Sequence, residues 1–144
     1  MTGSTWLIAL LAWATSVGAA AAQDVTLAVT HAGCGSATPP LVAPPRSKEE
    51  RERVTATWIA ADRLQVDVWD DETAEDVVDG DSATVALAGD TLTLSYAHRR
   101  APTHAQERMP ACLFAAKLSF VVSGIARASY RVHVDGHEVA VVDG

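Results

Sequence analysis

The feature that most constrains the fold of this chain is a two-residue alternation of apolar and polar side chains, repeated in many short segments. In residues 64–69, for example, Leu64, Val66 and Val68 lie on one side of an extended chain, and the intervening residues lie on the other. Side chains of a β-strand point alternately to the two faces of a sheet, so this spacing predicts strands that bury one face. By the same spacing we expect strands over residues 24–30, 55–59, 64–69, 83–88, 91–97, 112–122, 130–134 and 137–142.

Two short turn sequences predict how some of these strands pair. Gly89-Asp90 is a two-residue loop of the kind that closes a β-hairpin. Pairing across it places Leu87 opposite Leu92 and Val85 opposite Leu94, so that all four apolar side chains share one face.

Asp135-Gly136 is the second hairpin signal. A two-residue turn there pairs Val134 with His137 and His133 with Glu138. The two histidines then fall on opposite faces of the hairpin, so the sequence predicts no metal site shared between them.

Helical periodicity is nearly absent. Only Ser47-Lys48-Glu49-Glu50, which fits a capping box, indicates a helical turn over about residues 48–53. Residues 31–46, 70–81 and 98–111 are interpreted as loops. About eight short strands with frequent turns predict an all-β fold, specifically an antiparallel β-sandwich, in one domain over residues 23–144.

Residues 120–134 resemble a recurring piece of immunoglobulin-like, fibronectin-III-like and transthyretin-like β-sandwiches. In that piece a strand ends, a hydrophobic residue fills the core from the connection, and a tyrosine begins the next strand. The resemblance implies that Ile125 is buried and that the hydroxyl of Tyr130 bonds back to the connecting loop. It implies a fold class and carries no active site.

The first residues have the pattern of a secretory signal peptide. No charged side chain occurs from Trp6 to Ala22, and Ala20-Ala21-Ala22 supplies the small residues that signal peptidase requires. We expect cleavage of residues 1–22, with Gln23 as the new N-terminus, and a periplasmic or secreted protein of a bacterium. The alternative is a permanent anchor helix, but the apolar run is shorter than the roughly 20 residues that span a bilayer.

The only two cysteines are Cys34 and Cys112. In an exported protein such a pair normally oxidises, so we predict a disulfide between them. It would stabilise the fold by roughly 4 kcal/mol in the loop-entropy account. The alternatives are a reactive or metal-binding pair, and a lipoprotein anchored at Cys34, because Ala32-Gly33-Cys34 resembles the end of a lipobox.

The acidic composition excludes some partners. The formal net charge is −7 at pH 7, whereas binding to nucleic acid or to an anionic membrane surface needs a basic face. No second apolar run is long enough to span a bilayer, so no integral membrane span is expected after cleavage.

Two segments are candidates for a binding site. Seven carboxylates between residues 70 and 81 supply the oxygen ligands that Ca²⁺ prefers, although their spacing does not fit an EF-hand and a solvated loop is the alternative. These residues are Asp70, Asp71, Glu72, Glu75, Asp76, Asp79 and Asp81.

The second segment is residues 98–111, a long polar loop in the sequence interpretation. Its basic side chains suit a small anionic ligand or a protein partner, and they are His98, Arg99, Arg100, His104 and Arg108. An alternative is a site for copper formed by His98, His104 and Met109. A mobile loop without a function is the third interpretation.

No sequence motif of nucleophilic or metal-dependent hydrolysis occurs. The sequence therefore favours a non-enzymatic binding or interaction module of the bacterial envelope. A periplasmic protein that binds copper or calcium is the alternative, and a hydrolase whose site forms only in three dimensions is a weaker one.

Overall fold

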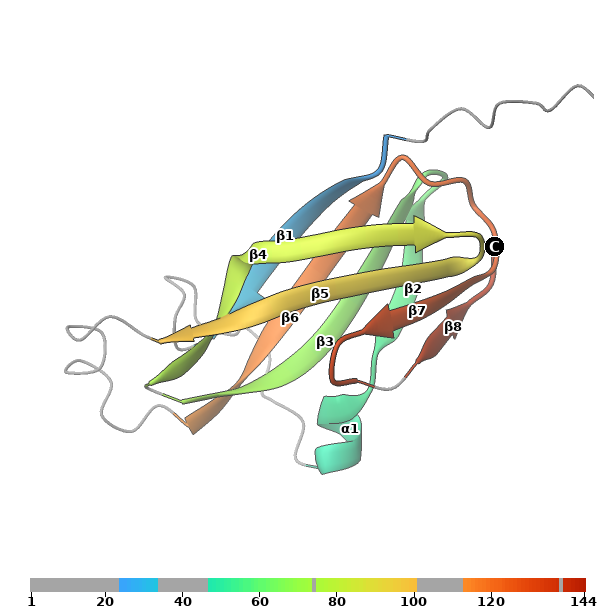
Figure 1. Ribbon diagram of the computed structural model, residues 1–144. Coiled ribbons are helices and arrows are strands. Elements are labelled where there is room, and N and C mark those ends of the chain that lie inside the picture. The colour runs from blue at the N-terminus through green and yellow to red at the C-terminus, as the bar shows by residue number, and fades with distance from the viewer. Residues whose placement is uncertain (1–23, 34–46, 74, 101–112, 138) are drawn as a thin grey trace, which may run out of the picture.

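The computed structural model describes residues 24–33, 47–73, 75–100, 113–137 and 139–144. Within these residues the chain forms eight strands and one short helix (Figure 1). In chain order they are β1 (Thr26–Ala32), α1 (Lys48–Glu52), β2 (Thr55–Ala60), β3 (Arg63–Thr73), β4 (Asp76–Ala88), β5 (Thr91–Arg100), β6 (Leu113–Ser123), β7 (Tyr130–Val134) and β8 (Ala140–Val142). The predicted all-β class is confirmed.

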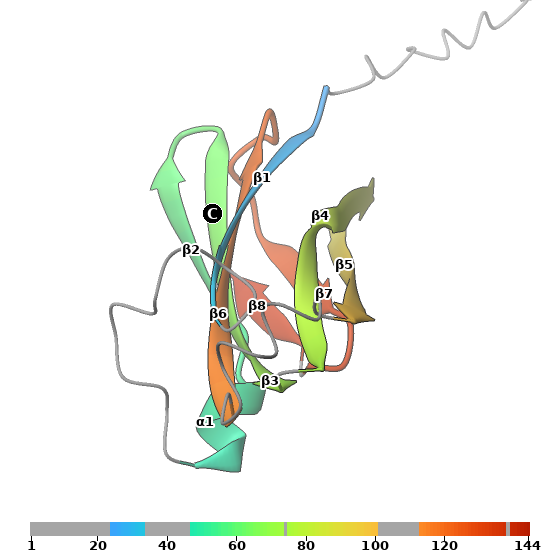
Figure 2. The ribbon, with the colours of Figure 1, turned by 90° about the vertical axis from the view of Figure 1, so that its left-hand side faces the viewer.

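The strands form two sheets of four, which lie as two layers (Figure 2). One sheet has the order β1-β6-β3-β2 and the other has the order β4-β5-β7-β8. Neighbouring strands are antiparallel except for β5 and β7, which run parallel. The expectation of a wholly antiparallel fold is therefore wrong at this one pair, because the chain crosses from β6 in one sheet to β7 in the other and does not return by a hairpin.

The core lies between the two sheets and consists of the inward-facing residues that the alternation predicts. Leu64, Val66 and Val68 of β3 are fully buried against Leu92 and Leu94 of β5 in one apolar cluster. Burial of such side chains is the main favourable contribution to folding, at about 25 cal/mol per Å² of apolar surface.

The first predicted hairpin has the expected register, with Leu87 opposite Leu92 and Val85 opposite Leu94. The second does not. Tyr130 pairs with Val142 and Val132 with Ala140, so β7 and β8 are shifted by one residue from the expected pairing. β8 begins only at Ala140, because the connection after Val134 is longer than the two-residue turn that we expected.

Two segments that we interpreted as loops are strands. β3 continues to Thr73, β4 begins at Asp76, and β5 continues to Arg100, so residues 70–81 and 98–100 belong largely to the sheets. Their polar side chains do not prevent pairing, because the backbone groups of one strand hydrogen-bond those of its neighbour. Opposite charges also meet across the ladder, as Asp76 lies opposite Arg100.

The connection from β6 to β7 has the geometry that the resemblance implied. The hydroxyl of Tyr130 donates a hydrogen bond to the carbonyl oxygen of Ala126 at 2.8 Å, and Ile125 is almost fully buried. The predicted helix is also present, because the Oγ atom of Ser47 accepts a hydrogen bond from the backbone N–H of Glu50 at the start of α1.

Several predicted features lie outside the described residues. These are the signal peptide, both cysteines of the predicted disulfide (Cys34 and Cys112), and His104, Arg108 and Met109. In the part of the chain that the structure describes, no helix has the length and apolar character needed to cross a membrane.

Candidate ligand-binding site at the polar end of the core

The inward-facing rows of two strands change from apolar to polar toward one end of the layers. On β3, Leu64, Val66 and Val68 are followed in the same register by Asp70 and Glu72. On β5, Leu92 and Leu94 are followed by Tyr96 and His98. Because the alternation is unbroken, these polar side chains still point between the sheets. Their position creates a polar site that continues the core.

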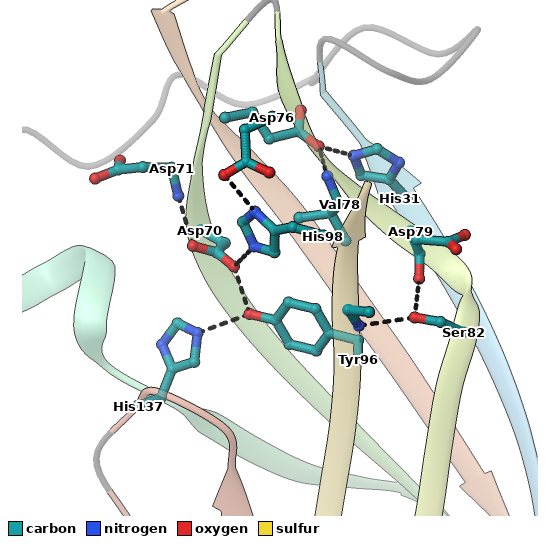
Figure 3. Close-up of polar contacts among 12 residues, drawn as sticks. His31, Asp70, Asp71, Asp76, Val78, Asp79, Ser82, Tyr96, His98 and His137 are labelled. Carbon is teal, nitrogen blue, oxygen red and sulfur yellow. Dashed lines mark hydrogen bonds and ion pairs between the residues drawn. The ribbon is translucent and has the colours of Figure 1, made fainter. Parts of the chain in front are cut away.

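Asp70 is the centre of this site (Figure 3). Its Oδ2 atom accepts hydrogen bonds from the hydroxyl of Tyr96 at 2.7 Å and from Nε2 of His98 at 2.8 Å. Its Oδ1 atom accepts the backbone N–H of Asp71 at 2.8 Å. The carboxylate is therefore held by three donors from two strands, which fixes its orientation.

His98 bridges two carboxylates. Its Nε2 contacts Asp70, and its Nδ1 lies 3.3 Å from Oδ2 of Asp76. Ionised carboxylates only accept hydrogen bonds, so the geometry favours an imidazolium that carries a proton on both nitrogens. Burial lowers the pKa of His98, but the hydrogen bond and charge of Asp70, together with Asp76, outweigh it and raise the pKa above its ordinary value.

Tyr96 links Asp70 to a third element. Burial, and then the hydrogen bond and charge of Asp70, raise the pKa of Tyr96 far above its ordinary value, so its hydroxyl keeps its proton. That proton is donated to Asp70. The 3.0 Å contact between the hydroxyl oxygen and Nε2 of His137 must then have the imidazole as donor.

A hollow of about 440 Å³ lies beside these groups, and we call it the polar hollow. Its lining comes from α1, from β3, from β5 and from the connection between β7 and β8. These residues are Lys48, Arg51, Glu52, Trp69, Asp70, Asp71, Tyr96, His98, Asp135, Gly136 and His137. Two ion pairs lie beside the hollow at α1. Nζ of Lys48 lies 3.4 Å from Oε1 of Glu52, and Nε of Arg51 lies 3.5 Å from Oδ1 of Asp71.

Glu72 forms a second polar contact between the layers and is only 1% exposed. Its Oε1 atom accepts the backbone N–H of Val78 and contacts Nε2 of His31, each at 2.7 Å. Val78, whose N–H donates to Glu72, is the strand partner of His98. The contacts of Glu72 therefore lie next to those of Asp70 and His98. Glu72 thus links β3 to β1 of the same sheet and to β4 of the other sheet.

The structure separates the residues that the sequence grouped. His98 is part of the polar site, whereas alternation puts Arg99 on the opposite face of β5, where it lies 3.9 Å from Asp79. Arg100 is exposed at the end of the strand. Of the basic residues predicted in segment 98–111 that fall within the described ranges, only His98 lines the polar hollow, where Asp70 and Asp71 of the acidic segment also lie.

The acidic stretch is likewise divided. Asp70 and Glu72 point inward and are engaged by other residues, whereas Asp71 and Glu75 are exposed. Among the described side chains no three His, Cys, Asp or Glu residues are grouped so as to hold a metal ion. The copper proposal also involves His104 and Met109, which lie outside those ranges.

Sequence reasoning missed Tyr96 and His31 as functional candidates, and it considered Glu72 only as a calcium ligand and His137 only as a partner of His133. For β3 and β5 a signal was present, because polar residues continue the inward register of an apolar row. The register of a strand is set by its partners, so a polar residue in that register points into the molecule and does not mark a loop.

No family model, no curated protein and no solved structure matches this chain. The interpretation of the site therefore depends on its own geometry.

Proposed function

We propose that this protein is an exported binding module that holds a small ligand in the polar hollow. The observation that carries the proposal is the hydrogen-bonded series His137–Tyr96–Asp70–His98–Asp76 beside a hollow of about 440 Å³. Ligand sites typically have volumes of about 300–1,000 Å³ and a few fixed polar groups that orient the ligand.

The polar groups are fixed before a ligand arrives. They project from β3, β4, β5 and the β7–β8 connection, and each is hydrogen-bonded to the next. Side chains held in this way lose little further conformational entropy on binding. This arrangement supports a recognition role, because a preorganised site converts more of its contacts into affinity.

The export and disulfide proposals depend on sequence positions. The uncharged N-terminal run and its small-residue end support cleavage after Ala22. Cys34 follows β1 and Cys112 precedes β6, and these two strands are neighbours in one sheet. The bond from Tyr130 to Ala126 supports an immunoglobulin-like or transthyretin-like type of sandwich.

The binding proposal is tested by amide-detected NMR on protein recovered after expression of the full 144-residue chain with its own leader. The probes are butylammonium, butyrate and glucose, which represent a cation, an anion and a neutral polyol. We expect at least one probe to shift the amide signals of residues 96–98 and 135–137.

Two tyrosine variants give a matched comparison. Tyr96→Phe removes the hydroxyl that joins His137 to Asp70, whereas Tyr130→Phe removes a hydroxyl that bonds Ala126, away from the hollow. The first should weaken binding of the active probe and the second should not. Signal changes confined to other parts of the molecule, or no changes with any probe, would overturn the proposal.

A further inference from the structure

The two residues on either side of Gly136, in the connection between β7 and β8, supply hydrogen-bond acceptors to the polar hollow. Asp135 and His137 both line it. The backbone N–H of Asp135 bonds the carbonyl of Leu94 at 3.2 Å, and the N–H of His137 bonds the carbonyl of Val134 at 3.0 Å. These bonds attach the turn to β5 and β7, so the backbone positions that carry the side chains of Asp135 and His137 are fixed.

The hydrogen-bond directions determine what His137 offers. Since Tyr96 donates its only proton to Asp70, the hydroxyl oxygen accepts the N–H on Nε2 of His137. In a neutral imidazole the other nitrogen, Nδ1, then carries a lone pair and is an acceptor. This Nδ1 is buried and has no hydrogen-bond partner among the described residues. A buried acceptor without a donor costs free energy. Nδ1 has almost no surface accessible to water, so the imidazole must turn slightly toward the polar hollow before a ligand N–H can reach it and recover that cost.

The charges around the hollow are unequal. Lys48 is paired with Glu52, Arg51 with Asp71, and His98 with Asp70. The remaining lining carboxylate is that of Asp135, for which no cationic partner occurs among the described residues. The hollow is thus left with one uncompensated negative charge.

We propose that the polar hollow takes the cationic nitrogen of a small organic ligand, an ammonium or guanidinium group, between the Asp135 carboxylate and Nδ1 of His137. This inference rests on the proposed function and adds the class of ligand. Such a group carries several N–H donors, which match two acceptors, and its charge is opposite to that of Asp135.

The overall charge of the protein acts in the same direction. A formal net charge of −7 raises the local concentration of cations near the surface and repels anions. The expectation of a small anionic ligand depended on Arg99, Arg100 and Arg108. Neither Arg99 nor Arg100 lines this hollow, and Arg108 lies outside the described residues. The chemistry of the polar hollow therefore favours a cation over an anion.

The test compares three probes of similar size on the full chain as exported: butylammonium, butyrate and butanol. We expect amide-detected NMR titrations to show that butylammonium binds at residues 135–137 and that its affinity falls as salt is added. A short peptide that contains a lysine side chain is the fourth probe. Binding of both the peptide and the free amine indicates recognition of the ammonium group itself, and binding of the peptide alone points to a protein as its source.

The matched variants are Asp135→Asn and Asp90→Asn. Both residues are exposed aspartates in hairpin turns, but only Asp135 lines the hollow. Asp135→Asn should weaken butylammonium binding by about tenfold, the effect expected from loss of one charge-assisted hydrogen bond. Asp90→Asn should leave the affinity unchanged.

The outcomes separate this inference from the proposed function. If butyrate or butanol binds in the hollow as well as butylammonium does, or if Asp135→Asn has no effect, the inference is wrong and the binding function stands. If no probe perturbs the hollow, both are wrong.

Discussion

Nε2 of His98 lies 2.8 Å from Oδ2 of Asp70, and the two residues come from different sheets. The bond therefore joins the layers at the end of the core where aliphatic packing stops. Asp70 and Asp76 raise the pKa of His98 despite the opposing effect of burial. The direction of this pKa shift determines how the stability of the fold should depend on pH.

We expect His98→Gln to lower the free energy of unfolding by about 1 kcal/mol at acidic pH, because the side chain is partly exposed and its ion pairs are screened. A raised pKa in the folded state means that the stabilising contribution is complete below the unfolded pKa of about 6.5 and is lost as pH rises through the folded pKa. Urea unfolding at about pH 5.5 and about pH 9 should show the larger difference between variant and wild type at the lower pH.

The control is His133→Gln, on the exposed side of β7. It should show little difference from wild type at either pH. An effect of His98→Gln that stays the same at both pH values would contradict the assignment of a stabilising imidazolium.

Glu72→Ala should destabilise the protein by about 3 kcal/mol, because the change leaves the buried N–H of Val78 without an acceptor and removes the partner of His31. Glu75→Ala is the control, since Glu75 is exposed, and should change stability by less than about 0.5 kcal/mol. Chemical denaturation measures both. Equal effects would mean that Glu72 does not link the sheets.

Gly33→Ala should be strongly destabilising, because a Cβ atom at this position would overlap Oε2 of Glu72 and lie 2.7 Å from Cβ of Ala116. Gly80→Ala provides the comparison, since the nearest atom to its Cβ would be 3.7 Å away, which is ordinary contact. The thermal midpoint should fall for the first variant and stay close to wild type for the second. A fall of similar size in both would show that backbone freedom, and not close packing, explains Gly33.

Tyr130→Phe should lower stability by about 1 kcal/mol, the usual net value of one hydrogen bond. The ring keeps its place beside Trp58, at 6.0 Å between centroids, so only the bond to Ala126 is lost. Urea unfolding measures the change. An unaltered midpoint would show that this corner contributes nothing to stability.

The cysteine prediction is tested by mass. Protein recovered after export should contain a Cys34–Cys112 disulfide, so alkylation should label two thiols only after reduction. Labelling of both without reductant would rule out the bond. A lipid adduct at Cys34 would instead support the lipoprotein alternative.

Most of the strands could be predicted because their apolar residues follow a period of two. The hairpin at Gly89-Asp90 is an example in which the turn and the apolar pattern agree, and its register is as expected. The hairpin at Asp135-Gly136 is the contrary case, because β8 begins only at Ala140 and the same turn signal gave a register wrong by one residue.

The candidate site was only partly predictable. His98 was selected for its place in a polar segment, but its partners Asp70 and Tyr96 are 28 and 2 residues away along the chain, and only the stacking of two sheets brings them together. His137 joins them through Tyr96 across 41 residues. No local pattern encodes contacts of this kind.

The sequence by itself determined the secondary structure class and the inward row of each main strand, because both depend on neighbours along the chain or across one turn. The tertiary structure alone decided that the inner rows of β3 and β5 meet where both become polar. The physical reason is that alternation fixes which side of a strand a residue faces but not which strand lies opposite. The position of Asp70 against His98 and Tyr96 therefore follows from how the two sheets pack.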